Sequence, residues 1–199
     1  MSRKAIQLDQ LSQLAELFRL FSNGRHLNRV SDPALWAELE RAETDYCDLF
    51  KALGYELRID GRGFAWFHNE EASNTVNKAS RQLALLFMVI FDTQADAGKP
   101  LLRFGDWIID RALLATVYEQ HQELLTAEEL DIDTLSGLLE TASRFGFART
   151  DSSGRWQLLP AVCRYLDHFE ALAAERNDSS RAGYAFDPEE GPEEKNTGI

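Results

Sequence analysis

One pattern occurs twice in this chain and constrains its fold most: an apolar helix face, a glycine, and then a short hairpin. In the first copy, apolar residues recur every three or four positions from Leu35 to Leu53, which predicts one helix that begins after Asp32. Gly54 ends this helix, because glycine adopts the left-handed conformation at little cost. Residues 55–68 alternate around a Gly-rich turn, which predicts a hairpin. A helix followed by such a hairpin is the second half of a winged helix.

The second copy lies near the C-terminus. Apolar residues from Leu135 to Phe145 predict a helix that Gly146 ends, and residues 147–159 predict a hairpin. Two matching copies with a long period indicate an internal duplication. We therefore predict a mostly α chain with small β-hairpins (α+β), built as tandem winged-helix domains with an acidic disordered tail. The predicted parts are a first winged-helix domain at 1–72, a second at 73–176, and a flexible tail at 177–199.

The segments between the two copies are less regular, and their predicted elements follow from local pattern. In the first half of the chain we expect an opening helix at 11–21, a short link or strand beside the first hairpin at 25–30, and a linker at 70–77. In the second half we expect a short strand at 101–104, a helix capped by Asp106, and an acidic loop at 123–133 that ends in the N-cap Asp133. A closing helix is expected at 162–172.

The segment 79–93 is apolar on nearly all sides, which indicates a helix that is buried on most faces. Two explanations stay open: it is the central helix of the second domain, or it is a dimer contact. Buried between subunits, so much apolar surface would form an obligate interface, and we therefore predict a homodimer.

The chain is strongly acidic, with 33 Asp and Glu against 21 Lys and Arg and a net charge of −12. This charge weakens any claim that the whole surface binds nucleic acid, although a local basic patch is compatible with it. The longest apolar run, residues 83–91, is too short for a membrane span, and the N-terminus lacks a signal-peptide pattern. We expect a cytoplasmic protein, with Cys47 and Cys163 as buried thiols rather than a disulfide.

No catalytic or metal-binding motif is found in the sequence. The four histidines are scattered and have no partner at metal-ligand spacing. Residues 97–100 resemble a P-loop only in part, and the calcium-loop pattern that begins at Asp131 is broken at Leu135. We therefore predict no enzyme, no cofactor and no metal.

Five arginines lie where winged helices contact phosphate: on the first hairpin, on the second hairpin, and at the end of the second apolar helix. They are Arg58, Arg62, Arg149, Arg155 and Arg144. A single arginine on a hairpin is usually a solvated charge, but matching positions in two domains favour a phosphate track. The helix at 133–145 carries two acids and one arginine, so it is poorly suited to a major groove. We expect weak, sequence-independent DNA contact.

Four further residues are candidates for partner binding. Arg25 and His26 follow a helix C-terminus, where the simpler explanation is that they satisfy the last helical carbonyls. Trp36 and Trp107 lie off the main apolar faces, where ordinary packing is the simpler explanation and an aromatic anchor is the alternative.

Three short motifs carry a resemblance to a known family. They are Gly24-Arg25-His26-Leu27 after the opening helix, Gly63-Phe64-Ala65-Trp66-Phe67 in the first hairpin, and Ser143-Arg144-Phe145-Gly146-Phe147 at the second. In this order the chain, from about Leu11 to Ala171, resembles the MukE family of bacterial condensins, and its MksE branch most.

The resemblance implies a non-enzymatic subunit that dimerises and binds a kleisin (MukF or MksF). Through the kleisin it would join an SMC ATPase (MukB or MksB) at the nucleoid, in chromosome organisation and segregation or in plasmid defence. The alternative is an autonomous tandem winged-helix transcriptional regulator. Charge separates the two, because a regulator needs a basic recognition helix and this chain has none.

Overall fold

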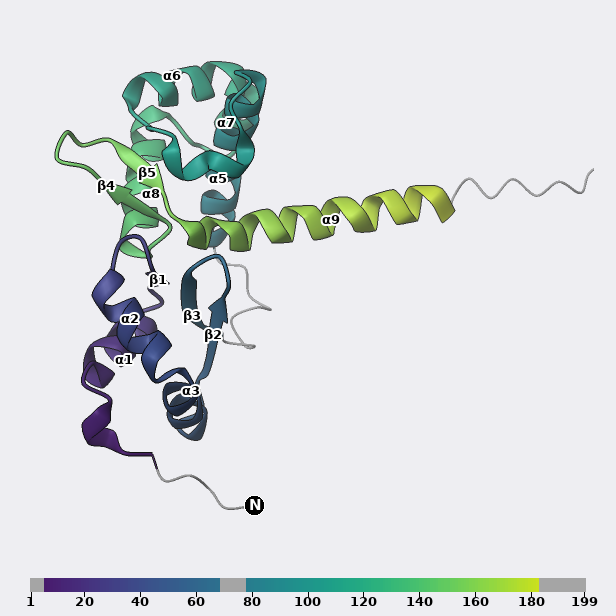
Figure 1. Cartoon of the computed structure of the whole chain (residues 1–199). Coiled ribbons are helices and arrows are strands. Elements are labelled where there is room, and N and C mark those ends of the chain that lie inside the picture. Colours follow the sequence, from purple (N-terminus) through teal and green to yellow (C-terminus); the bar gives the residue numbers. More distant parts are fainter. Residues whose placement is uncertain (1–5, 69–77, 183–199) are drawn as a thin grey trace, which may run out of the picture. The chain divides into compact units, whose positions relative to one another are not determined.

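The computed structural model describes residues 6–68 and 78–182, and the predicted linker at 70–77 lies outside them. The chain divides into one compact unit that ends at Cys163 and a second that begins at Arg164 (Figure 1). Helices predominate beside two small antiparallel sheets, which confirms the predicted α+β class. Both hairpins belong to the first unit. We call residues 6–68 the first module and residues 78–163 the second module, and the division at 72 and 73 stays a prediction.

The first module contains three helices, a short 3-10 turn and three strands. Its elements are η1 (Leu8–Gln10), α1 (Leu14–Ser22), β1 (Leu27–Asn28), α2 (Pro33–Arg41), α3 (Glu43–Ala52), β2 (Glu56–Asp60) and β3 (Phe64–His68). The sheet order is β1-β3-β2, so the predicted short strand beside the first hairpin is confirmed.

The single helix predicted after Asp32 is wrong, because two helices occupy this segment. The chain breaks at Ala42, whose φ of −127° and ψ of 31° are not helical. Leu39, Ala42 and Tyr46 are nevertheless all buried in one core. The apolar spacing therefore continues through the break, and periodicity alone does not detect it.

Aromatic rings fill the core of the first module. The ring centroid of Phe67 lies 5.0 Å from those of both Phe21 and Phe50. Phe21 and Phe50 are almost fully buried, and Trp36 joins the same core with 3% exposure. Large rings of this kind supply much of the buried apolar area in a module of this size.

The second module is mainly helical and ends in the second hairpin. Its elements are α5 (Lys78–Asp96), η2 (Leu101–Asp106), α6 (Arg111–Gln120), α7 (Gln122–Ala127), α8 (Ile132–Arg144), β4 (Ala148–Thr150), β5 (Trp156–Leu158) and η3 (Pro160–Val162). The C-terminal helix α9 (Cys163–Ala182) follows, so residues 177–182 of the predicted tail are helical, and the remainder lies outside the described residues.

Helix α5 is the interior helix of the second module. Leu86, Phe87 and Ile90 are almost fully buried, and α5 packs against α6, α8 and η2. Met88 is exposed on its outer side. Of the two explanations for its apolar sequence, the structure supports a central helix. The expected dimer therefore cannot rest on an uncovered α5.

Three local predictions in the second module are wrong. Residues 101–104 form the 3-10 helix η2 instead of a strand. The N-cap of the next helix is Asp110, which accepts a hydrogen bond from Leu113 N, and not Asp106. The acidic loop contains α7, and Asp131 caps α8 by accepting from Thr134 N. In each case the sequence held two local patterns of similar strength, such as two neighbouring acids that could each cap the helix, and the prediction chose the wrong one.

The two helix ends that precede the hairpins have the same geometry. Gly54 and Gly146 have φ of +88° and +79°. Tyr55 N donates to Phe50 O at 2.9 Å, and Phe147 N donates to Ala142 O at 2.8 Å, each five residues back. This is the bond pattern of a helix closed by a left-handed glycine. The predicted glycine helix ends and both hairpins are confirmed.

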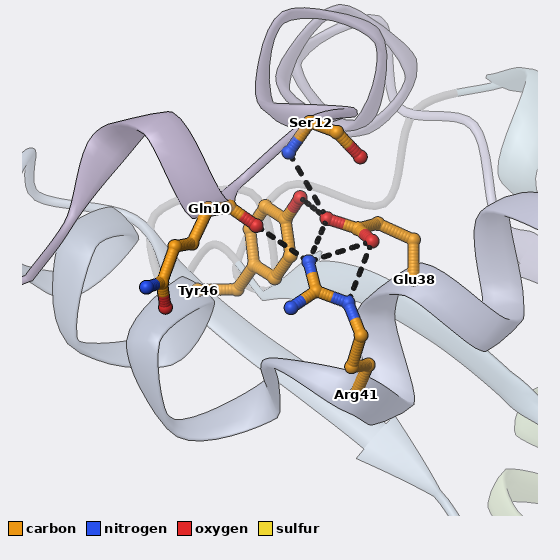
Figure 2. Close-up of polar contacts among 5 residues, drawn as sticks. All are labelled: Gln10, Ser12, Glu38, Arg41 and Tyr46. Atoms are coloured by element: carbon orange, nitrogen blue, oxygen red, sulfur yellow. Dashed lines mark hydrogen bonds and ion pairs between the residues drawn. The ribbon is translucent and has the colours of Figure 1, made fainter.

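A partly buried carboxylate joins the N-terminal segment to α2 and α3 (Figure 2). Glu38 accepts hydrogen bonds from Ser12 N (3.1 Å), Tyr46 Oη (2.9 Å) and the Arg41 guanidinium (2.7 Å), and Arg41 also donates to Gln10 O. Burial raises the pKa of the Glu38 carboxyl, but the hydrogen bonds from Arg41, Tyr46 and Ser12 outweigh it, so its pKa lies below 4.5. Burial raises the pKa of the Tyr46 phenol.

We predict that Glu38→Gln lowers the free energy of unfolding by about 1–3 kcal/mol near neutral pH, because it weakens charge-assisted hydrogen bonds. A folded-state pKa below the unfolded value stabilises the protein above pH 4.5, and this stabilisation is lost as pH falls through the folded pKa. The difference between wild type and variant should therefore shrink below pH 4.5 in urea titrations. Glu16→Gln, on the exposed side of α1, controls for the loss of one surface charge. A pH-independent difference would contradict this account.

Candidate functional site

The segment after α1 runs from an exposed turn into the interior. Gly24 N donates to Phe21 O at 2.9 Å and Arg25 N donates to Leu20 O at 3.2 Å, which closes the helix. His26 is 4% exposed and Asn28 is fully buried. These two buried polar side chains, one just before β1 and one within it, need hydrogen-bond partners.

His26 finds its partner in the second module. His26 N donates to Phe145 O at 2.9 Å, and His26 Nδ1 lies 3.0 Å from the same oxygen. Because a carbonyl oxygen only accepts, the second contact requires a hydrogen on Nδ1. The imidazole also packs against Phe147, with 4.4 Å between ring centroids.

Asn28 contacts two further segments of the second module. Its Nδ2 donates to Gly146 O at 2.8 Å, and its Oδ1 accepts from Ala161 N at 3.2 Å. A Cβ on Gly146 would lie 3.2 Å from both His26 N and His26 C, and closer still to the His26 carbonyl oxygen. We call this set the module junction: His26, Asn28, Phe145, Gly146 and Ala161. It joins β1 to the turn after α8 and to η3.

The junction explains what His26 does within the chain. The simpler explanation predicted that His26 satisfies a carbonyl at the end of the preceding helix α1. His26 does contact a helix-terminal carbonyl, but it is that of Phe145, the C-cap of α8. Arg25 is exposed, and its Nη2 lies 3.6 Å from Asp32 Oδ1. No local pattern connects His26 to residues more than one hundred positions later, so sequence analysis missed the junction. Partner binding by Arg25 and His26 stays a prediction.

Three of the five arginines predicted to contact phosphate form ion pairs with neighbouring acids. Arg58 pairs with Glu56, Arg62 with Asp60, and Arg155 with Asp151, each with a nitrogen-to-oxygen distance of 2.8 Å. Hydrogen bonds from Arg62 lower the pKa of Asp60, and those from the Arg155 backbone and side chain lower the pKa of Asp151. The positive charge of each of these three arginines is therefore neutralised by the neighbouring carboxylate.

The other two arginines contact neutral oxygens. Arg144 donates to Thr141 Oγ1 at 2.9 Å, and Arg149 donates to Gln157 Oε1 from Nε (3.0 Å) and Nη2 (2.8 Å). The structure thus divides the predicted phosphate track into compensated and uncompensated arginines. DNA binding by any of the five stays a prediction.

Both predicted tryptophan anchors lie in the interior. Trp36 is 3% exposed beneath the Arg29 guanidinium, whose carbon lies 5.2 Å from the ring centroid. Trp107 is 6% exposed and packs against Phe91, with 4.9 Å between ring centroids. Packing is the role that the structure shows for each, and direct partner contact through them stays a prediction.

Within the described residues, the metal-ligating and thiol side chains form neither a metal-ion cluster nor a disulfide. Within residues 6–68 and 78–182, no group of three or more His, Cys, Asp or Glu side chains could hold a metal ion. Cys47 and Cys163 do not form a disulfide, and burial raises the pKa of the Cys47 thiol, which makes it a poor nucleophile.

None of the described helices combines the length and apolar character needed to cross a membrane.

Comparison with known proteins identifies the family. No curated protein matches the chain. The family model "Condensin complex protein MksE" matches residues 12–170, which are 159 of the 199 residues. The matched range contains the module junction and both hairpins, including the three motifs that carried the predicted resemblance. The chain therefore belongs to the MksE family of condensin complex proteins, and the prediction from its motifs is confirmed.

Proposed function

We propose that this chain is a non-enzymatic subunit of a MukBEF- or MksBEF-type SMC complex. It acts as a homodimer in the cytoplasm at the nucleoid, binds a MukF- or MksF-like kleisin, and through the kleisin joins a MukB- or MksB-like ATPase. The complex serves chromosome organisation and segregation or plasmid defence. The observation that carries this proposal is the family match across both modules.

The repeated helix ends and hairpins support a tandem winged-helix architecture. Gly54 and Gly146 close equivalent helices, and an antiparallel hairpin follows each one. The module junction adds buried hydrogen bonds between the two modules. A partner that contacts both modules would therefore find them at a fixed distance from each other.

The segment around η2 is the surface that best supports protein binding. Leu102 is 98% exposed, and Leu101 and Ile108 are 44% and 47% exposed. Beneath them, Trp107 and Phe104 pack against Phe91, which gives the segment a firm base. Exposed aliphatic side chains on a rigid base are typical of protein interfaces. We propose that the kleisin contacts this segment and that Trp107 supports it from below.

We predict that Leu102→Asp weakens kleisin binding about tenfold, because it places a charge in an apolar contact. The melting temperature should not change, since Leu102 is almost fully exposed. Leu53→Asp in the first module is the control, because Leu53 is exposed to 57% and lies outside η2. Titration calorimetry with the kleisin middle region measures the effect.

Equal losses in Leu102→Asp and Leu53→Asp would reject the η2 contact but leave the family role intact. Light scattering of the wild type tests the dimer separately. A monomer at micromolar concentration would reject the homodimer.

A further inference from the structure

The two hairpins differ in local charge. Residues 55–68 contain Glu56, Asp60, Arg58 and Arg62, so the first hairpin carries no net charge. Residues 147–159 contain Arg149, Arg155 and Asp151, a net charge of +1, and Arg144 adds another positive charge at the end of α8. This positive excess stands out in a chain whose net charge is −12. An anion would therefore meet less repulsion at the second hairpin than at the first.

Arg149 is held in place without being neutralised. It lies directly opposite Gln157 in the β4–β5 pair, and both Nε and Nη2 donate to the Gln157 amide oxygen. These two guanidinium donors form the fork that suits a phosphate. Exchanging an amide oxygen for a phosphate oxygen costs less than displacing a carboxylate, as Arg62 and Arg155 would require.

Arg144 precedes the turn between α8 and β4, and Arg149 follows it. Arg144 is the last residue of α8, it is exposed, and it donates to Thr141 Oγ1. The residues between the two arginines include Phe145 and Gly146, whose carbonyl groups accept hydrogen bonds from His26 and Asn28. The module junction therefore fixes the turn that carries both arginines. Neither guanidinium has a carboxylate within ion-pairing distance in the part of the chain that the structure describes.

We propose that Arg144 and Arg149 are the phosphate-binding arginines of this subunit, and that they contact the backbone of duplex DNA without reading sequence. This inference rests on the proposed function, because a condensin subunit works on DNA. It narrows the predicted set of five phosphate-binding arginines to two and excludes the three that are ion-paired, Arg58, Arg62 and Arg155. Helix α8 carries Asp133 and Glu140 on exposed positions, which agrees with backbone contact and opposes base readout.

The test is binding of the full chain to a fluorescent random-sequence duplex between about 50 and 200 mM salt. Losing two phosphate contacts should reduce the slope of log affinity against log salt by about 2 in R144Q/R149Q. R144K/R149K should keep most of the slope, because lysine retains the point charge, while affinity falls through loss of the fork. Circular dichroism melts should be unchanged, since both side chains are exposed.

Two controls separate local contact from total charge. D151N/R155Q removes a compensated pair from the same hairpin at constant net charge and should keep the wild-type slope. K99Q removes one exposed positive charge from the same module and should change the slope by much less than R144Q/R149Q. An unchanged slope in R144Q/R149Q, or an equal change in K99Q, would overturn the proposal.

A guanidinium also binds carboxylates, so a polyglutamate peptide tests whether an acidic protein segment is the ligand instead of DNA. If the peptide bound through Arg144 and Arg149 and duplex DNA did not, the DNA assignment would be wrong. Kleisin capture by R144Q/R149Q should stay at the wild-type level, so failure of this inference and failure of the proposed function give different results.

Discussion

Replacing Gly146 by alanine should lower the free energy of unfolding by about 3–5 kcal/mol, the largest single-residue effect that we expect. Two costs combine at this position. A φ of +79° is unfavourable for any residue with a side chain, and the new Cβ would press against the His26 backbone. The His26 backbone is held by its own hydrogen bond to Phe145 O and leads directly into β1, so it cannot move aside as a flexible side chain can, and the module junction must open.

Gly54→Ala is the matched control, because Gly54 ends the equivalent helix in the first module. Its φ of +88° imposes the same backbone cost, but a Cβ there meets nothing within 4 Å. We expect a loss of only about 1–2 kcal/mol. Urea titrations of both variants give the comparison. Equal costs would mean that β1 and the turn after α8 are not in contact in solution.

Replacing Asn28 by alanine should cost about 2–4 kcal/mol, the second largest effect. The change removes a donor and an acceptor at once and leaves Gly146 O and Ala161 N without those bonds inside the protein. It also leaves space where a fully buried side chain stood. Asn23→Ala, at the exposed C-cap of α1, controls for loss of an asparagine and should cost much less.

The two junction variants should not be additive. Both disrupt contacts between β1 and the turn after α8, so the double variant should lose at least about 1 kcal/mol less than the sum of the single losses. A double-mutant cycle measured by urea unfolding tests this coupling. Additive losses would show that Asn28 and Gly146 act independently.

Much of the local structure could be predicted from the sequence, because short-range patterns determine it. Gly54 and Gly146 marked helix ends, and alternating residues with a Gly-rich turn marked the first hairpin to within one residue of β2 and β3. The break at Ala42 escaped prediction because its neighbours keep the apolar spacing of an unbroken helix. Helix α7 escaped because it has only six residues and is followed directly by acidic residues.

The module junction could not be predicted, because its contacts depend on tertiary structure. His26 and Asn28 resemble ordinary polar residues of a link, and their partners lie 118 and 119 positions away or farther. The contacts of the five arginines likewise could not be predicted from the sequence. The sequence predicted four arginines on the two hairpins and one at the end of the second apolar helix, but only the fold shows which of them already contact a carboxylate and which contact Thr141 or Gln157.

Capture of the kleisin by the purified full chain tests the central claim most directly. The chain, immobilised by its N-terminus, is mixed with an MksF-like kleisin and an MksB-like SMC ATPase from the same organism, at low and physiological salt. The account predicts that the kleisin is retained without the ATPase, and that the ATPase is retained only when the kleisin is present. No retention of the kleisin at either salt concentration, or tight binding of the chain alone to one operator sequence, would contradict it.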